Sequence, residues 1–173
     1  MTAIARISSA LFDPMDRSGW LLPSLARVTF LAVFFFYFLA SAGTKTDGGL
    51  LSPSAGAFAQ IFPKAAEAVL YDVTQLTGFQ RLAILVGTLA EYTLPVLIVL
   101  GLFTRPAALA MIGFVIVQTV VDVTGHGVPL GAWFNTAPEL IDERALWVFL
   151  LVVLVVKGAG PISIDRLFKP ASG

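Results

Sequence analysis

Long apolar stretches separated by short charged segments dominate the chain. Four of them predict membrane-spanning helices, over about 24–42, 82–104, 106–123 and 139–158. A helix crosses the hydrocarbon core of a bilayer when about 17–25 of its residues are mainly apolar. The first two stretches reach that length directly, and the other two reach it where Asp122 and Lys157 lie near the membrane surfaces. We therefore predict an all-α fold, a bundle of four transmembrane helices that forms a single membrane domain over 1–173.

A shorter amphipathic pattern lies between the first and second stretches. The apolar residues that recur there at spacings of three and four are Ala66, Val69, Leu70, Val73 and Leu76. This spacing places them on one face of a helix over 63–77. Pro63 suits its first turn and Gly78 its end. We expect this extra amphipathic helix to lie across the outer mouth of the bundle.

Proline and tryptophan mark the bends and ends of the predicted helices. Pro95 lies inside the second stretch, where it frees a backbone carbonyl and is expected to bend the helix. Arg105 and Pro106 form a tight turn before the third stretch. We interpret Arg105 as a cytoplasmic anchor and as a cap for the end of the second helix, the alternative being a ligand contact. Trp133, like the two other tryptophans, is expected near a membrane surface.

The composition supports residence in a membrane. Hydrophobic residues make up 57% of the 173 residues, charged residues make up 13%, and the mean hydropathy is +0.88. A soluble domain is about 45–50% apolar and about 25% charged, so this chain could not cover its surface with polar groups in water. Its 11 basic and 11 acidic residues leave no net charge for binding a polyanion. We expect the lipid bilayer and other membrane subunits as partners, and no nucleic acid.

The residue inventory limits the chemistry that the chain can perform alone. It has 0 cysteines, which excludes thiol nucleophiles, disulfides and iron–sulfur ligation by the chain. Its 1 histidine, His126, is interpreted as a loop residue rather than a metal ligand, and no metal site is expected. Any electrons in a redox role must therefore reside on a partner or a diffusible carrier. We do not expect the protein to be an enzyme by itself.

The positions of Lys and Arg predict the orientation. With both termini in the cytoplasm, seven basic residues lie on or near the inner side and four on or near the outer side. The inner set is Arg6, Arg17, Arg27, Arg105, Lys157, Arg166 and Lys169. Residues 30–42 could also form a signal-peptide core with its cleavage site, but Asp13 and Asp16 before them favour an uncleaved first helix.

Glu91 is the most informative polar residue, because it lies inside the second stretch. A carboxylate at that depth costs about 2.5–3.5 kcal/mol on insertion scales, so it should face the bundle interior. It is either a proton-exchanging or quinone-ligating group, or a buried polar tie between helices.

A second group of polar residues is expected at a similar depth in the membrane to Glu91. Gln118 and Asp122 are four residues apart and share a face of the third helix. With Lys45 and Arg81 they could form an outer polar pocket around Glu91, the usual shape of a small-molecule site. The alternative is that Asp122 only marks the end of the helix in water.

Two motifs in the second half of the chain carry a resemblance to a known family. Residues 91–108 carry a Glu, an apolar run, the turn G-L-F-T-R and a small-residue entry into the third helix. Residues 158–166 read G-A-G-P-I-S-I-D-R. The first motif resembles the central signature of the DoxX family of small integral membrane proteins, and the second is similar to the closing motif of that family. Arg27 and Lys45 lie where the family has basic residues flanking its first helix.

The resemblance implies a four-helix protein of bacterial inner membranes. The family is linked to terminal quinol oxidase and thiosulfate–quinone systems and to membrane oxidoreductase complexes. We therefore expect a non-catalytic integral membrane subunit of a redox or respiratory complex, with quinone or bound lipid as its candidate ligand and no covalent cofactor. Two alternatives stay open, a purely structural accessory subunit of a larger complex and a small-solute channel or transporter.

Overall fold

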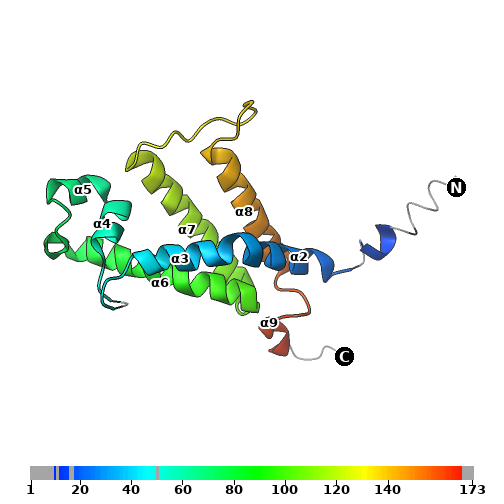
Figure 1. Cartoon of the computed structure of the whole chain (residues 1–173). Coiled ribbons are helices and arrows are strands. Elements are labelled where there is room, and N and C mark those ends of the chain that lie inside the picture. Colours follow the sequence, from blue (N-terminus) through cyan, green and yellow to red (C-terminus); the bar gives the residue numbers. More distant parts are fainter. Residues whose placement is uncertain (1–9, 11, 16–17, 50, 169–173) are drawn as a thin grey trace.

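Helices form the regular structure of the chain (Figure 1). The computed structural model describes residues 10, 12–15, 18–49 and 51–168. Among these residues no β-strand is present, which confirms the predicted all-α class. In chain order the helices are α2 (Leu21–Phe30), η1 (Leu31–Phe35), α3 (Phe36–Thr44), α4 (Ala55–Ile61), α5 (Pro63–Ala68), η2 (Val73–Gln75), α6 (Gly78–Leu100), α7 (Thr104–Thr124), α8 (Leu140–Lys157) and α9 (Ile164–Leu167).

Three segments are long and apolar enough to cross a membrane. The first runs from Leu21 to Thr44 through α2, η1 and α3, and the others are α6 and α7. Their 24, 23 and 21 residues correspond to about 36, 35 and 32 Å of helix, against a hydrocarbon core of about 30 Å. The fourth predicted stretch forms α8, of 18 residues, whose first turns carry Asp142, Glu143 and Arg144. The three apolar segments mark the chain as a membrane protein.

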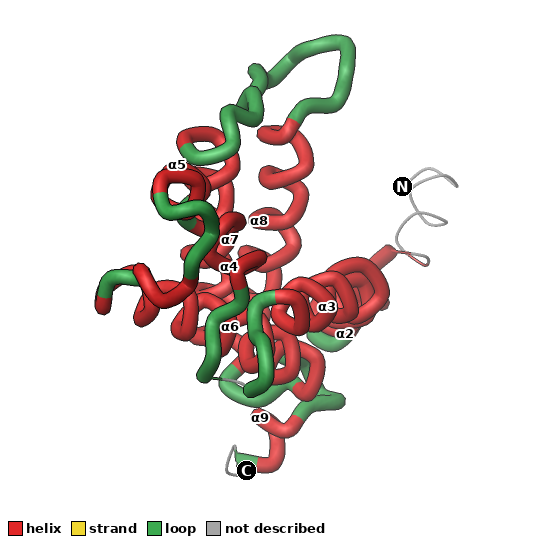
Figure 2. Tube along the Cα trace, turned by 60° about the vertical axis from the view of Figure 1, so that its left-hand side comes forward, coloured by secondary structure: helices red, strands yellow, loops and turns green. Residues whose placement is uncertain are grey.

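The helices pack in pairs that spread apart at one end. α3 packs along α6, α7 packs along α8, and α2 contacts both α6 and α8. Figures 1 and 2 show α7 and α8 rising together from the α2–α3 rod, joined at their far ends by residues 125–139. This end, which also carries residues 45–77, is called the loop end. The opposite end, with the turn at residues 101–103 and α9, is called the turn end.

A row of buried residues at a spacing of four faces the core from the first segment. Its members are Ala26, Phe30, Phe34, Phe38 and Ala42. In an α-helix of 3.6 residues per turn, a strict spacing of four drifts around the axis. The π-helical turn η1 takes in an extra residue and counters this drift, so the row keeps facing the core. Phe36, outside the row, is 69% exposed, so the aromatic run is divided between core and surface.

The second spanning helix lies four residues earlier than the sequence predicts, at 78–100 instead of 82–104. It ends where Gly101 adopts a left-handed conformation with φ of 67°. The Gly101 amide donates to the Ile98 carbonyl at 3.1 Å and the Leu102 amide to the Leu97 carbonyl at 2.9 Å. This pattern satisfies the last carbonyls of α6 and turns the chain into α7.

The continuous amphipathic helix predicted over 63–77 is not present. α5 ends at Ala68, Leu70 and Tyr71 adopt positive φ values of 53° and 64°, and a short 3₁₀ turn, η2, follows. The Tyr71 amide donates to the Ala66 carbonyl at 2.7 Å, which closes the helix after fewer than two turns. Ala66 packs with Ile84 in a small separate core. Helix α4, which the sequence analysis missed, completes this layer at the loop end.

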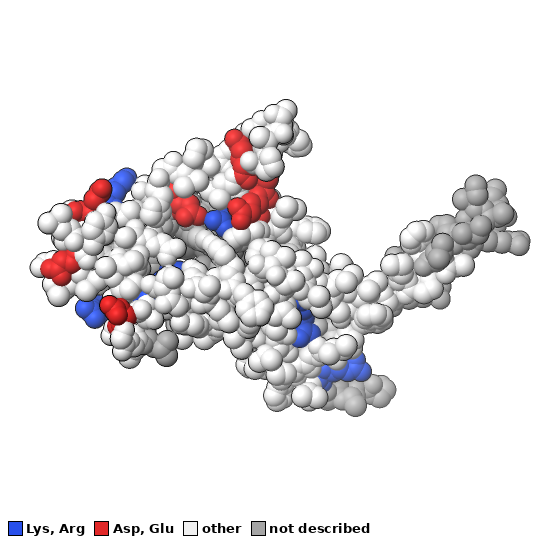
Figure 3. Space-filling model, in the orientation of Figure 1, with Lys and Arg blue, Asp and Glu red and all other residues white. Residues whose placement is uncertain are grey.

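Charged side chains lie toward the two ends of the molecule. Figure 3 shows acidic groups around the loop end and a largely uncharged surface over α2 and α3. Basic groups without visible acidic neighbours lie at the turn end, where Figure 1 places α9. Such a distribution is typical of a protein with an uncharged belt in hydrocarbon. Arg6, Arg17 and Lys169, which the orientation prediction used, lie outside the described residues.

Candidate functional site

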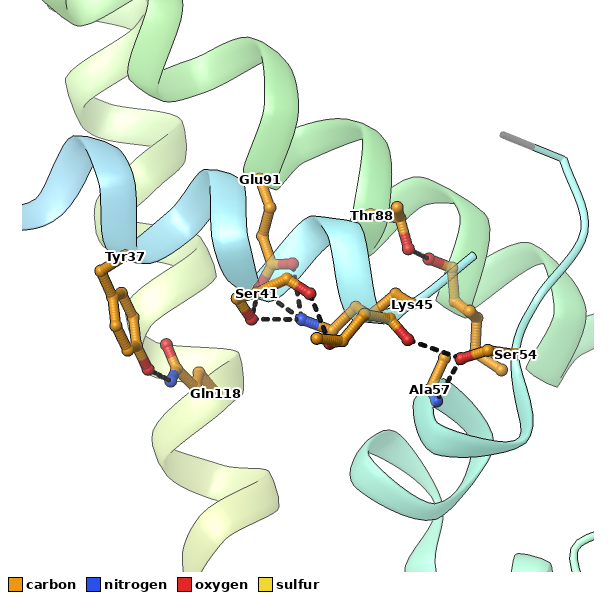
Figure 4. Close-up of polar contacts among 10 residues, drawn as sticks. Tyr37, Ser41, Lys45, Ser54, Ala57, Thr88, Glu91 and Gln118 are labelled. Carbon is orange, nitrogen blue, oxygen red and sulfur yellow. Dashed lines mark hydrogen bonds and ion pairs between the residues drawn. The ribbon is translucent and has the colours of Figure 1, made fainter. Parts of the chain in front are cut away.

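Lys45 and Glu91 form a buried ion pair between the end of α3 and the middle of α6 (Figure 4). The Lys45 Nζ atom lies 2.6 Å from Oε1 and 2.5 Å from Oε2 of Glu91. The two side chains are 5% and 4% exposed. Because each charge is neutralised at contact distance, neither is left unpaired inside the protein, where an isolated ion would be very costly.

Ser41 forms hydrogen bonds to both members of this ion pair. Its Oγ accepts a hydrogen bond from Lys45 Nζ at 2.9 Å and donates one to Glu91 Oε1 at 3.2 Å. Tyr37, Ser41 and Lys45 follow one another at a spacing of four, so they form a polar stripe on one face of α3. The stripe runs along the side of α3 that faces α6 and α7 (Figure 4).

The backbone around the ion pair is held from both helices. The Ser54 amide donates to the Lys45 carbonyl at 3.0 Å, and Ser54 Oγ accepts from the Ala57 amide at 2.9 Å, which ties α3 to the start of α4. On α6, the buried Pro95 has no N–H to offer the carbonyl of Glu91, four residues earlier. α6 nevertheless continues through Pro95 to Leu100.

Gln118 lies at the other end of the polar stripe. Its Nε2 donates to the hydroxyl of Tyr37 at 3.2 Å, which joins α7 to α3 (Figure 4). Its Oε1 is buried and accepts no hydrogen bond from the described residues. Gln118 therefore has an acceptor available for a water molecule or a ligand.

Asp122 pairs with Arg144 rather than with the group around Glu91. Arg144 Nη2 lies 2.8 Å from Asp122 Oδ2, and the two side chains are 11% and 26% exposed. The guanidinium also lies 4.3 Å from the centre of the Trp147 ring, within the range of a cation–π contact. Its Nε and Nη1 are buried without a partner among the described residues.

The residues of the pocket that the sequence predicts are thus divided among three separate pairs. Lys45 and Glu91 meet as expected, whereas Gln118 bonds Tyr37 and Asp122 bonds Arg144. Arg81 is exposed at the start of α6. Sequence spacing identified the polar residues of each helix, but it gave no information on which helix faces approach one another.

A groove of 320 Å³ opens between α7 and α8 at the loop end. Most of its walls are aliphatic side chains of the two helices, and Arg144 is its one charged lining residue. Leu130 and Trp133 line it from the 125–139 segment. Trp133 is exposed beyond the end of the helices, where an indole ring suits a membrane surface.

Arg27 is a central residue of the turn end that the sequence analysis treated only as a flanking charge. Its Nε donates to the Ile98 carbonyl at 3.2 Å and its Nη1 to the Ala159 carbonyl at 3.1 Å. Further bonds reach the carbonyls of Val99 and Ile162. One side chain thus joins α2 to the end of α6 and to the segment after α8, using the planar fork of donors that only Arg has.

Asp165 also holds the turn end together, through hydrogen bonds between its side chain and the backbone at the start of α7. Its two carboxylate oxygens accept from the amides of Phe103 at 2.6 Å and Thr104 at 2.9 Å. These amides open α7, so Asp165 caps the helix from a distance of about 60 residues in sequence. The closing motif at 158–166 was the sequence signal for this cap, although it did not indicate the partner.

The side chains of Arg105 and His126 each form one hydrogen bond to a backbone carbonyl. Arg105 lies in the first turn of α7, and its Nη2 donates to the Val156 carbonyl of α8 at 3.2 Å. The helix end that it caps is therefore that of α8, not that of α6 as the sequence predicted. His126 Nε2 lies 2.8 Å from the Gln60 carbonyl and links the 125–139 segment to α4. Within the described residues, no three His, Cys, Asp or Glu side chains gather as a metal site would require.

No family model, no curated protein and no solved structure matches the chain.

Proposed function

We propose that the protein is an integral membrane accessory subunit without a catalytic role of its own, and that its partner is a larger membrane complex. The observation that carries this proposal is the complete pairing of Glu91 with Lys45 and Ser41. A carboxylate neutralised at contact distance inside the protein is a tie between helices rather than an open proton or ligand site. The resemblance to DoxX proteins supports a redox or respiratory complex as the partner.

Exposed apolar side chains on the spanning helices support this accessory role. They include Val28, Val33, Phe36, Val86, Leu89, Leu109 and Val117. Hydrocarbon chains solvate such side chains, and the flat apolar faces of neighbouring membrane subunits can replace the lipid. The protein thus has apolar surface to offer to a partner in the membrane plane.

We also propose that α8 makes a fourth crossing, so that the protein is a four-helix bundle of the bacterial inner membrane with both termini in the cytoplasm. α8 is about 27 Å long for its 18 residues. Its charges lie in the first turns and at Lys157, near the two membrane surfaces. In this orientation Arg105, Lys157 and Arg166 face the cytoplasm, as the positive-inside rule requires.

Purification in a mild detergent, followed by identification of every co-purifying protein, tests the accessory role. We expect stoichiometric retention of membrane subunits. The paired replacement Lys45→Met with Glu91→Leu supplies the matched control, because an apolar pair of similar volume can replace an ion pair. Full partner retention and full activity of the assembly in that variant support a structural tie. Isolation of the chain alone from gently solubilised membranes would contradict the proposal.

A second candidate function, placement of a quinone, is favoured by the unpaired atoms near the polar stripe. Gln118 Oε1 and Arg144 Nε and Nη1 are buried and have no hydrogen-bond partner in the described part of the chain. The rings of Tyr37 and Trp147 lie 5.7 Å apart beside them. An aromatic ring with hydrogen-bonding oxygens suits such a setting. Quinone that co-purifies with the protein, and is lost in Gln118→Leu but kept in the double variant Lys45→Met with Glu91→Leu, would support this function. Equal quinone content in both variants would oppose it.

A further inference from the structure

Three exposed cationic side chains lie at the turn end, on three different helices. Arg105 lies on α7, Lys157 ends α8 and Arg166 lies on α9. We propose that they form a binding site for the phosphate headgroup of an anionic phospholipid. This proposal depends on the protein lying in a bilayer and does not depend on the accessory role.

Hydrogen bonds between the three helices place these cations close to one another. The bond from Arg105 Nη2 to the carbonyl of Val156 sets Arg105 beside Lys157, the next residue of α8. The Asp165 amide donates to the Gly101 carbonyl at 2.8 Å, and the Asp165 carboxylate caps α7. Arg166, the neighbour of Asp165, is therefore held beside the 101–105 turn.

Gly101 allows this close packing. Its φ of +67° is left-handed, and an added Cβ would lie 2.6 Å from Ser163 Cβ and 3.0 Å from Arg27 Cζ. Only glycine fits a position that combines this backbone conformation with such a close approach. The close approach of Ser163 and Arg27 to the turn therefore depends on glycine at position 101, and the Asp165 amide and carboxylate hold α9 against the turn and the start of α7.

The turn end carries an excess of positive charge. Over residues 21–30, 98–107 and 154–168 the sequence has one acidic residue, Asp165. Both of its carboxylate oxygens accept backbone amides of α7. Arg27 directs its donors at four backbone carbonyls and is directed inward. Arg105, Lys157 and Arg166 remain as exposed cations that an anion can approach.

Exposed apolar side chains surround these cations and indicate a lipid rather than a soluble anion. Ile162 is 77% exposed, Leu167 is 80% exposed, and Phe103 and Phe168 are also exposed. Large apolar side chains beside Arg and Lys are typical of segments that lie at the boundary of headgroups and acyl chains. At that depth a guanidinium or ammonium group lies level with lipid phosphates and makes charge-assisted hydrogen bonds to them.

Native mass spectrometry of the protein in detergent, with added phosphatidylglycerol or phosphatidylcholine, tests this site. The test variant Lys157→Gln with Arg166→Gln removes one Lys and one Arg from the turn end. The control Lys64→Gln with Arg81→Gln removes one Lys and one Arg from exposed positions at the loop end. A cation near an anionic surface contributes about fivefold in binding, so we expect about a 10- to 25-fold loss of phosphatidylglycerol in the test variant and little change in the control.

Several outcomes would overturn the site. One is equal loss of phosphatidylglycerol in the two double variants, and another is equal binding of the two lipids by the unmodified protein. Displacement of phosphatidylglycerol by millimolar inorganic phosphate would show a small-anion site instead of a lipid site. Thermal melting in each lipid gives a second measurement, in which phosphatidylglycerol is expected to raise the Tm of the control variant more than that of the test variant.

Discussion

Lys45 Nζ lies 2.5 Å from Glu91 Oε2, which links the last turn of the first spanning segment to the middle of the second. Both side chains are buried, and Ser41 forms a hydrogen bond to each of them. In a protein with few charges in its spanning helices, this pair fixes how α3 faces α6. Removing either partner leaves the other charge buried and unpaired.

Glu91→Gln is therefore expected to destabilise the protein by about 3–5 kcal/mol, as for other buried pairs broken on one side. Lys45→Met should have a similar effect for the same reason. The double variant Lys45→Met with Glu91→Leu should recover most of the loss, because no charge remains. Unfolding in mixed micelles of dodecyl maltoside and SDS measures the three free energies. Additive losses in the double variant would contradict a coupled pair.

Asp122→Asn is expected to cost less, about 1 kcal/mol. The Asp122–Arg144 pair is more exposed than the Lys45–Glu91 pair, with 26% and 11% of the side chains accessible. Arg144 also keeps its contact with the Trp147 ring when the carboxylate is neutralised. The same micelle assay compares the two pairs directly. A loss equal to that of Glu91→Gln would show that exposure does not set the strength of these pairs.

Arg27→Lys is expected to destabilise the turn end by about 2–4 kcal/mol, because hydrogen bonds from a charged donor contribute about 1.5–3 kcal/mol each. A lysine ammonium cannot reach the four carbonyls that the guanidinium bonds in one plane. Hydrogen exchange of the 159–162 segment should rise with the loss of stability. Arg81→Lys, at an exposed position on α6, is the matched control and should leave both measurements unchanged.

The 125–139 segment is expected to loosen in acid because of Glu139. Its Oε2 accepts the Ala132 amide at 2.6 Å, and this amide, followed by the Asn135 side chain, holds the pKa of Glu139 below its ordinary value of 4.5. Because the pKa of Glu139 is lower in the folded state than in the unfolded state, its ionised carboxylate stabilises the folded protein. This stabilisation is complete at a pH above the unfolded-state pKa and is lost as the pH falls through the folded-state pKa. Protection of the Ala132 amide should therefore be constant from neutral pH to about pH 5 and fall below about pH 4.

Hydrogen exchange between pH 7 and about pH 3 measures this protection. Glu139→Gln should show low protection of the Ala132 amide throughout. Glu143→Gln, an exposed change in the first turn of the same helix, should behave as the unmodified protein does. Unchanged protection in Glu139→Gln would show that other contacts hold the segment.

The spanning helices could be predicted from local sequence, whereas the structure of residues 63–77 could not. The apolar stretches predicted helices of spanning length because the number of apolar residues in a row is a property of the sequence alone. The continuous helix over 63–77 was wrong, since its spacing of apolar residues did not reveal that Leu70 and Tyr71 would adopt left-handed conformations. Backbone reversals of this kind depend on what the next segment packs against, here the small core around Ala66 and Ile84.

Composition and the positions of apolar and charged residues were enough to establish that the chain is helical, that it is apolar enough for a membrane, and that Glu91 must lie inside the protein. Hydrocarbon cannot hydrogen-bond a backbone or solvate a carboxylate, so these conclusions follow from composition and position. The partners of these residues follow from helix packing: Lys45 for Glu91, Tyr37 for Gln118, Arg144 for Asp122, and four backbone carbonyls for Arg27. Which charges meet depends on the angles and rotations with which whole helices pack, and these are set by contacts between residues far apart in the chain.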